Sequence, residues 1–198
     1  MPEVVIVAGP SGSGKSHLAE RLGWTVLRLD DFYFPHDHPG LPMSTLGIVD
    51  WDDVRSWDID GAMAAIVALC RDGSADLPVY DISVSDVVGA QRVSVAGDRF
   101  IAEGLFAPDI VAASREAGVL SAAICLTRPR LLVFTLRFAR DLREGRKPPT
   151  VLLRRGWRLM RDQPRVIAAA VEAGCEPMNP RRAYAVLSRR PPWRRRRA

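Results

Sequence analysis

The chain has few cysteines, few histidines and no long apolar run. Its 198 residues hold three cysteines, at positions 70, 125 and 175, and no CxxC pair. This argues against a disulfide framework and against a zinc site. The apolar stretch 61–70 is much shorter than the ~20 residues that cross a bilayer, and Glu3 and Gly9 interrupt the apolar N-terminus before a signal sequence could form. We therefore expect a cytoplasmic protein with no membrane partner.

Lysine is also scarce, and the basic residues are unevenly distributed. Only Lys15 and Lys147 are lysines among 28 basic residues. Residues 1–127 carry 18 acidic and 8 basic side chains, residues 128–165 carry 12 basic and 3 acidic ones, and the segment 177–198 has eight arginines and no acid. A single arginine is therefore weak evidence for a function, whereas Lys15 stands out.

The pattern of apolar residues predicts one α/β domain over 1–188, followed by a basic, disordered tail over 189–198. Short apolar runs alternate with segments of helical pattern, which is typical of βαβ units and a mostly parallel, five-stranded sheet. The expected strands are 4–8, 25–29, 76–80, 99–104 and 120–126. The expected helices are 15–23, 60–73, 107–118, 129–145 and a helix after 150 that breaks near Pro164.

A glycine-rich loop, GPSGSGKS, follows the first expected strand and opens the first expected helix. It fits the pattern GxxxxGK(S/T), in which backbone N–H groups and a helix N-terminus surround phosphate oxygens. In that pattern Lys15 reaches the β- and γ-phosphates and the Ser16 hydroxyl binds Mg²⁺. We therefore predict an ATP or GTP site made by Gly9, Pro10, Ser11, Gly12, Ser13, Gly14, Lys15 and Ser16.

Acidic residues stand directly after three expected strands. Asp30 and Asp31 follow 25–29, Asp81 follows 76–80, and Glu103 lies at the end of 99–104. Ligands of parallel α/β sheets bind beyond the carboxyl ends of the strands, and phosphoryl transfer needs a carboxylate near the acceptor hydroxyl as well as ligands for Mg²⁺. These carboxylates are candidates for both tasks. A structural role in a turn is the alternative for Asp30, and an indirect role behind the metal is the alternative for Glu103.

The expected helix 129–145 carries arginines on one stripe, including Arg137 and Arg140. We predict an arginine-rich lid over about 137–150 that neutralises charge on the transferred phosphoryl group. The alternative is a solvated basic face at a helix C-terminus, where cations are favourable in any case.

Taken together, these motifs resemble the uridine/cytidine kinase family, a nucleoside-kinase branch of the P-loop small-molecule kinases. The ordered set is GPSGSGKS, DDFY, WDDVRSWD, LPVYDI, AEG and RFARDLREGR, and it covers residues 3 to about 147. One departure is the segment ISVSD, which lacks the histidine that contacts the base in the family. The resemblance implies a P-loop kinase fold, ATP as phosphate donor and Mg²⁺.

The resemblance also implies roles for individual residues. Asp30 would be the general base for a sugar 5′-hydroxyl, and Asp52 would bind the ribose hydroxyls. Tyr33 and Tyr80 would contact the nucleoside, and Glu103 would support the metal. Arg137 and Arg140 would serve sugar and phosphate.

The resulting expectation is an ATP- and Mg²⁺-dependent kinase of a small hydroxyl-bearing metabolite, with a nucleoside as the leading substrate. One alternative is a kinase of another alcohol, such as a vitamin precursor or a sugar phosphate. Another is a nucleotide-binding switch protein whose basic tail engages RNA or a partner. A homo-oligomer is compatible with the sequence.

Overall fold

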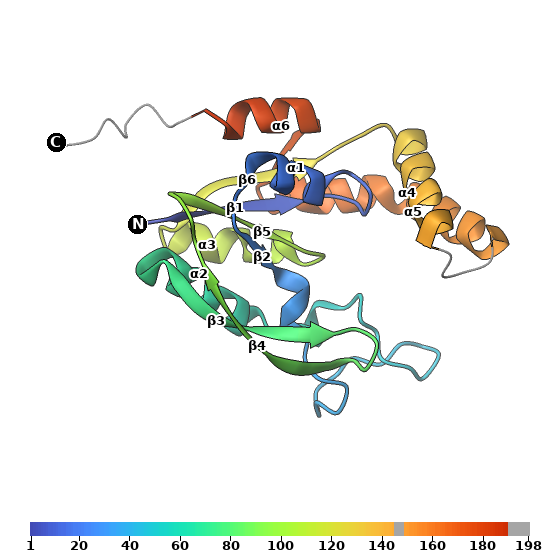
Figure 1. The fold of residues 1–198 in the computed structure, drawn as a ribbon. Coiled ribbons are helices and arrows are strands. Elements are labelled where there is room, and N and C mark those ends of the chain that lie inside the picture. Colours follow the sequence, from blue (N-terminus) through green and yellow to red (C-terminus); the bar gives the residue numbers. More distant parts are fainter. Residues whose placement is uncertain (145–148, 190–198) are drawn as a thin grey trace. The chain divides into compact units, whose positions relative to one another are not determined.

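The computed structural model describes residues 1–144 and 149–189 of the chain. Figure 1 labels its elements. The described residues form two compact units: the first comprises 1–8 and 24–123, and the second comprises 9–23, 124–144 and 149–189. The predicted single domain over 1–188 stays a prediction.

A five-stranded sheet with the order β2-β5-β1-β6-β7 is the main sheet of the fold. Its strands are β1 (Glu3–Ala8), β2 (Val26–Arg28), β5 (Arg99–Glu103), β6 (Leu120–Leu126) and β7 (Glu176–Met178). The pairs β1–β5, β2–β5 and β6–β7 are parallel. Helices flank the sheet, so the predicted α/β fold with a mostly parallel five-stranded sheet is confirmed.

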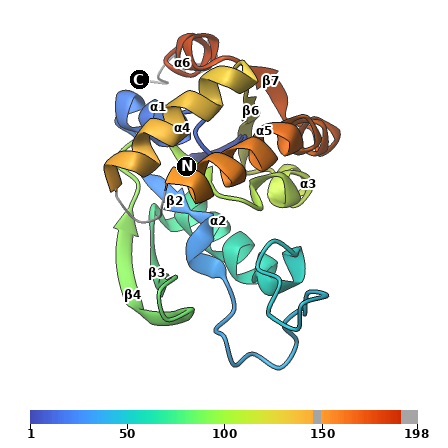
Figure 2. The same ribbon diagram turned by 90° about the vertical axis from the view of Figure 1, so that its right-hand side faces the viewer.

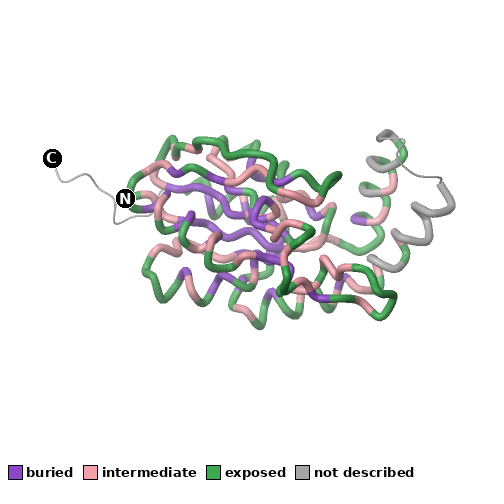
Figure 3. The backbone as a smooth tube through the Cα atoms, turned by 90° about the horizontal axis from the view of Figure 1, so that it is seen from below, coloured by how far each residue is buried: buried purple, intermediate pink, exposed green. Residues whose placement is uncertain are grey.

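The first unit has its core on strands β1 and β5. Val4 to Val7 and Phe100 are fully buried, which explains why these strands read as continuous apolar runs rather than alternating ones. The buried stretches appear purple in Figure 3. Helix α2 (Ile59–Asp72) begins where the Asp58 carboxylate accepts a hydrogen bond from the Gly61 N–H at 2.9 Å, and it ends at the left-handed Gly73.

The expected strand at 76–80 exists, but it belongs to a separate hairpin. Strand β3 (Ser74–Asp81) pairs antiparallel with β4 (Asp86–Ser94) in a two-stranded sheet, which Figure 1 shows as two green arrows. The sequence reading missed β4, whose residues are almost all exposed. It also missed β7, which has three residues. The expected helix 107–118 is shorter than predicted: a 3₁₀ turn, η3 (Ala107–Ile110), precedes α3 (Val111–Glu116).

The second unit contains the remaining helices. They are α1 (Lys15–Leu22), α4 (Arg130–Glu144), α5 (Pro149–Glu172) and α6 (Pro180–Leu187). Helices α4 and α5 pack against each other, and Figure 2 shows them side by side. The predicted break near Pro164 is wrong, because α5 continues through this proline. Proline removes only one helical hydrogen bond, and residues on both sides of it, Gln163 and Ala170, are buried.

Candidate functional site

The phosphate loop leaves β1 at Ala8 and returns into α1 at Lys15. Gly9, Gly12 and Gly14 have φ angles of 136°, 86° and 102°, in the left-handed region. A Cβ atom on Gly9 would lie 2.7 Å from the Leu126 carbonyl oxygen. The backbone of the loop therefore approaches the end of β6 as closely as only glycine permits.

Lys15 and Ser16 occupy the first turn of α1. The Lys15 ammonium donates a hydrogen bond to the Gly9 carbonyl at 3.0 Å, which closes the loop on itself. The N-cap residue, Gly14, has no side chain to satisfy the first N–H groups of the helix, and the Ser16 side chain is exposed. A helix N-terminus whose first N–H groups have no side-chain cap, and whose first residue is a lysine, favours the binding of an anion. The loop residues therefore fit the phosphate groups of a nucleotide.

Ser13 lies at the centre of the loop and is fully buried. Its N–H donates to the Pro10 carbonyl at 3.0 Å, and its carbonyl accepts from Nε of Arg128 at 2.9 Å. Its hydroxyl has no hydrogen-bond partner within the described ranges. The sequence reading missed Arg128, because nothing local marks it among so many arginines.

Asp30 lies in a short 3₁₀ turn, η1 (Leu29–Phe32), directly after β2. Its Oδ1 atom accepts a hydrogen bond from the Leu105 N–H at 3.0 Å. In the part of the chain that the structure describes, its second oxygen, Oδ2, has no such partner. One carboxylate oxygen is therefore fixed and the other is available to a ligand.

Glu103 lies at the same edge of the sheet as Asp30. In the strand register it is opposite Arg28 of β2, two residues before Asp30, and opposite Val7 of β1. The first unit therefore brings both predicted carboxylates to the carboxyl ends of neighbouring parallel strands, as expected for an α/β ligand site.

An aromatic cluster surrounds Tyr33. Its ring lies 5.8 Å from Trp51, 5.7 Å from Tyr80 and 5.8 Å from Phe106, measured between ring centroids. The Tyr33 hydroxyl donates to the Trp51 carbonyl at 3.2 Å. The structure thus joins the two predicted tyrosines and adds Trp51 and Phe106. The sequence analysis missed Phe106, because an isolated phenylalanine reads as a core residue.

The charges around Tyr33 come from predicted site residues. Burial raises the pKa of Tyr33 well above its ordinary value, and the negative charges of Asp30 and Asp52 raise it further. Burial likewise raises the pKa of Tyr80. Both phenols therefore stay protonated at neutral pH, so they act as hydrogen-bond donors and apolar surfaces.

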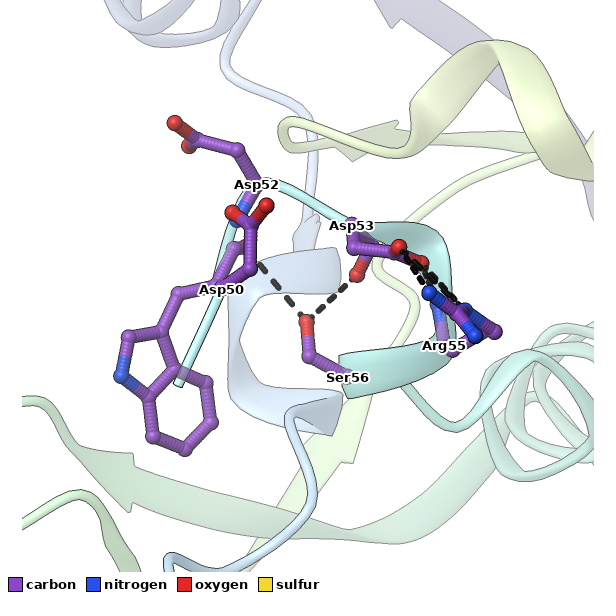
Figure 4. A network of polar contacts seen from close by, with 6 residues as sticks. Asp50, Asp52, Asp53, Arg55 and Ser56 are labelled. Carbon is purple, nitrogen blue, oxygen red and sulfur yellow. Dashed lines mark hydrogen bonds and ion pairs between the residues drawn. The ribbon is translucent and has the colours of Figure 1, made fainter. Parts of the chain in front are cut away.

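Asp52 lies in an acidic turn that Figure 4 shows in detail. Its neighbour Asp53 is paired with Arg55 at 2.7 Å, and hydrogen bonds from Arg55 lower the pKa of Asp53 to about 2. The exposed Asp52 carboxylate points away from this pair. Among the described residues, Asp52 forms a hydrogen bond only through its backbone N–H, which donates to Oδ1 of Asp50 at 3.2 Å. Asp53 is thus a structural residue, whereas Asp52 is accessible to a ligand.

Two of the other carboxylates have local partners. Asp31 is buried and lies 3.8 Å from Arg28, and burial raises its pKa above the ordinary value. Asp81 accepts hydrogen bonds from the N–H and the hydroxyl of Ser83, at 2.8 and 2.7 Å, in the β3–β4 turn. Both carboxylates therefore have structural tasks in the first unit.

Most side chains of the predicted lid, about 137–150, are not described. Arg137 and Arg140 lie on helix α4, but their side chains are not described, and residues 145–148 lie outside the described ranges, as does the tail from 190 onward. The roles assigned to these arginines stay predictions.

The magnesium ligands also stay predictions. Within residues 1–144 and 149–189, no three or more histidine, cysteine, aspartate or glutamate side chains form a group that could hold a metal ion. Mg²⁺ in phosphoryl-transfer sites is usually held by one or two protein oxygens together with phosphate oxygens and water, so this finding does not test the predicted ligands Ser16 and Glu103. None of the described helices is both long and apolar enough to cross a membrane.

Comparison with known proteins supports the fold. No protein-family model matches the chain, and no curated protein matches it significantly. A solved structure of a candidate fructose transport system kinase from Silicibacter sp. TM1040 is similar, with 19% identity over 90% of this chain and 88% of that chain and a TM-score of 0.55. A candidate uridine kinase from Bacillus stearothermophilus is similar at 19% identity, over 70% and 78% of the two chains, with a TM-score of 0.44. The first of these two similarities supports the α/β fold described above.

Proposed function

We propose that the protein is an ATP- and Mg²⁺-dependent kinase that phosphorylates a hydroxyl group of a small metabolite, with a nucleoside 5′-hydroxyl as the leading acceptor. The observation that carries this proposal is the geometry of Asp30. Its Oδ1 is fixed by the Leu105 N–H, its Oδ2 is available, and it is close enough to Tyr33, in the aromatic cluster, to raise the pKa of that phenol.

The chemistry follows from these residues. The Asp30 carboxylate accepts the proton of the acceptor hydroxyl as the hydroxyl oxygen forms a bond to the γ-phosphorus, and the bond from that phosphorus to the bridging oxygen breaks, which releases ADP. Gly9 to Ser16 would hold the phosphates, and Mg²⁺ would supply charge neutralisation. Catalysis of this kind depends mainly on positioning and electrostatics.

The aromatic cluster supports an acceptor with a flat ring. Tyr33 and Trp51 are partly exposed and offer ring surfaces for stacking, whereas Tyr80 and Phe106 are buried and pack against Tyr33. The accessible Asp52 carboxylate would accept hydrogen bonds from vicinal hydroxyls. A nucleoside combines a flat base with a ribose diol. A sugar or sugar phosphate has the hydroxyl groups but no flat base.

The first experiment measures ADP release by the purified protein with ATP and Mg²⁺, alone and with nucleosides, sugars and vitamin precursors. The panel includes fructose because one structural neighbour is named for it. Stimulation by a nucleoside is the expected result. Stimulation by another alcohol would keep the mechanism and change the substrate, and the absence of stimulation by any acceptor would contradict the proposal.

A second experiment tests the general base. Asn replaces Asp30 with a side chain that still accepts the Leu105 hydrogen bond but takes no proton at neutral pH, so Asp30→Asn should lower acceptor phosphorylation by about 10²-fold or more with ATP binding unchanged. Asp60→Asn, an exposed change on α2, is the matched control. Unchanged turnover in Asp30→Asn would remove Asp30 from this role.

A further inference from the structure

Arg128 makes an unusual contact with the phosphate loop. It follows β6 and is half-buried, and its Nε donates a hydrogen bond to the Ser13 carbonyl at 2.9 Å. No acidic side chain pairs with it in the described part of the chain. A cation near the N-terminus of a helix is unfavourable, and Lys15 already supplies one at α1. The unfavourable position of the Arg128 charge therefore indicates that this side chain has a role at the loop.

The Ser13 contact determines which way the loop amide points. The described peptide bonds are all trans, and in a planar trans peptide the C=O and the following N–H point in opposite directions. Because the Ser13 carbonyl points toward Arg128, the Gly14 N–H points away from Arg128. On the other side of Ser13, its N–H is fixed by the Pro10 carbonyl.

Arg128 is itself held by the second unit's long helix. The Gln163 side-chain amide, on α5, donates to the Arg128 carbonyl at 2.9 Å, and Gln163 is only 3% exposed. A Cβ atom on Gly14 would lie 3.2 Å from the outer guanidinium nitrogen of Arg128. The guanidinium therefore packs directly behind the loop where α1 begins.

We propose that Arg128 is a positioning residue of the phosphate loop. Arg128 holds the Ser13–Gly14 peptide so that the Gly14 N–H faces the bound phosphates. Gln163 in turn fixes Arg128 through the hydrogen bond to the Arg128 carbonyl. This inference rests on the proposed nucleotide site and adds to it a residue that acts from outside the GxxxxGK(S/T) pattern.

The test compares the affinities of wild type and Arg128→Gln for ATP, ADP and adenosine by calorimetry. A hydrogen bond from a charged group contributes roughly 1.5–3 kcal/mol, so the affinity for ATP and ADP should fall by about 10- to 100-fold. Adenosine, which has no phosphates, should bind as before. Arg128→Lys keeps a charged donor and should recover much of the loss. Arg130→Gln, an exposed arginine two residues further on, is the matched control.

The outcomes separate the two proposals. If wild type binds ATP and Arg128→Gln binds it equally well, the inference is wrong and the nucleotide site stands. If wild type does not bind ATP, the proposed function itself fails. An equal loss for ATP and adenosine would indicate a general loss of structure and would also overturn the positioning role. Should Arg128→Gln fail to fold, Gln163→Met keeps the guanidinium and removes only its anchor, and it should weaken ATP but not adenosine; unchanged ATP binding in that variant would contradict the proposal.

Discussion

Gly104 packs closely against Asp30, the candidate catalytic carboxylate of the first unit. It follows β5 and is buried, and a Cβ atom at this position would lie 2.7 Å from Cβ of Leu29 and 2.8 Å from Oδ1 of Asp30. Neither neighbour can move easily, because Leu29 is fully buried and Asp30 is fixed by the Leu105 N–H. Its φ angle is not positive, so the effect of Gly104→Ala is steric rather than conformational.

Adding a methyl group to a packed site of this kind costs about 1–3 kcal/mol. The free energy of unfolding of Gly104→Ala should fall by that amount, measured by urea denaturation, and the melting temperature should fall by about 2–12 °C for a chain of this length. Because the methyl group displaces the Asp30 oxygen, acceptor phosphorylation should fall as well.

Gly97→Ala is the matched control for Gly104→Ala, because nothing lies within 4 Å of a Cβ atom at Gly97 and its φ angle is also not positive. Both changes reduce the freedom of the unfolded chain equally. If the two variants differ in unfolding free energy by less than about 0.5 kcal/mol, Leu29 and Asp30 can move to accommodate the methyl group, and the prediction is wrong.

Two further predictions concern buried polar groups. Burial raises the pKa of Asp31, so its neutral form is favoured in the folded state, and its contribution to stability is present at low pH and is lost as the pH rises through the raised pKa. The effect of Asp31→Asn on the free energy of unfolding should therefore be more favourable at about pH 7 than at about pH 4, and an equal effect at both pH values in urea denaturation would contradict this. The Ser13 hydroxyl is buried without a partner among the described residues, so Ser13→Ala should raise the unfolding free energy by about 1–3 kcal/mol, compared with the exposed control Ser11→Ala. A loss of stability in Ser13→Ala would show that the hydroxyl does have a partner.

The sequence by itself determined the elements whose signals are local. The first strand, the glycine-rich loop after it and α1 follow from a short apolar run, three glycines and a helical pattern. The ends of α1 and α2 follow from Gly23 and Gly73, both in the left-handed region. Asp30 and Glu103 could be placed at one edge of the sheet because the carboxyl ends of parallel strands lie together.

Only the tertiary structure decided what depends on distant partners. Strand β3 pairs with β4 rather than with the main sheet, and α5 continues through Pro164 where a local rule predicted a break. Arg128 meets Ser13 across 115 residues, and Leu105 meets Asp30 across 75. Contacts of this kind arise from packing between segments far apart in the chain, and neither composition nor periodicity encodes which arginine or which backbone N–H will be the partner.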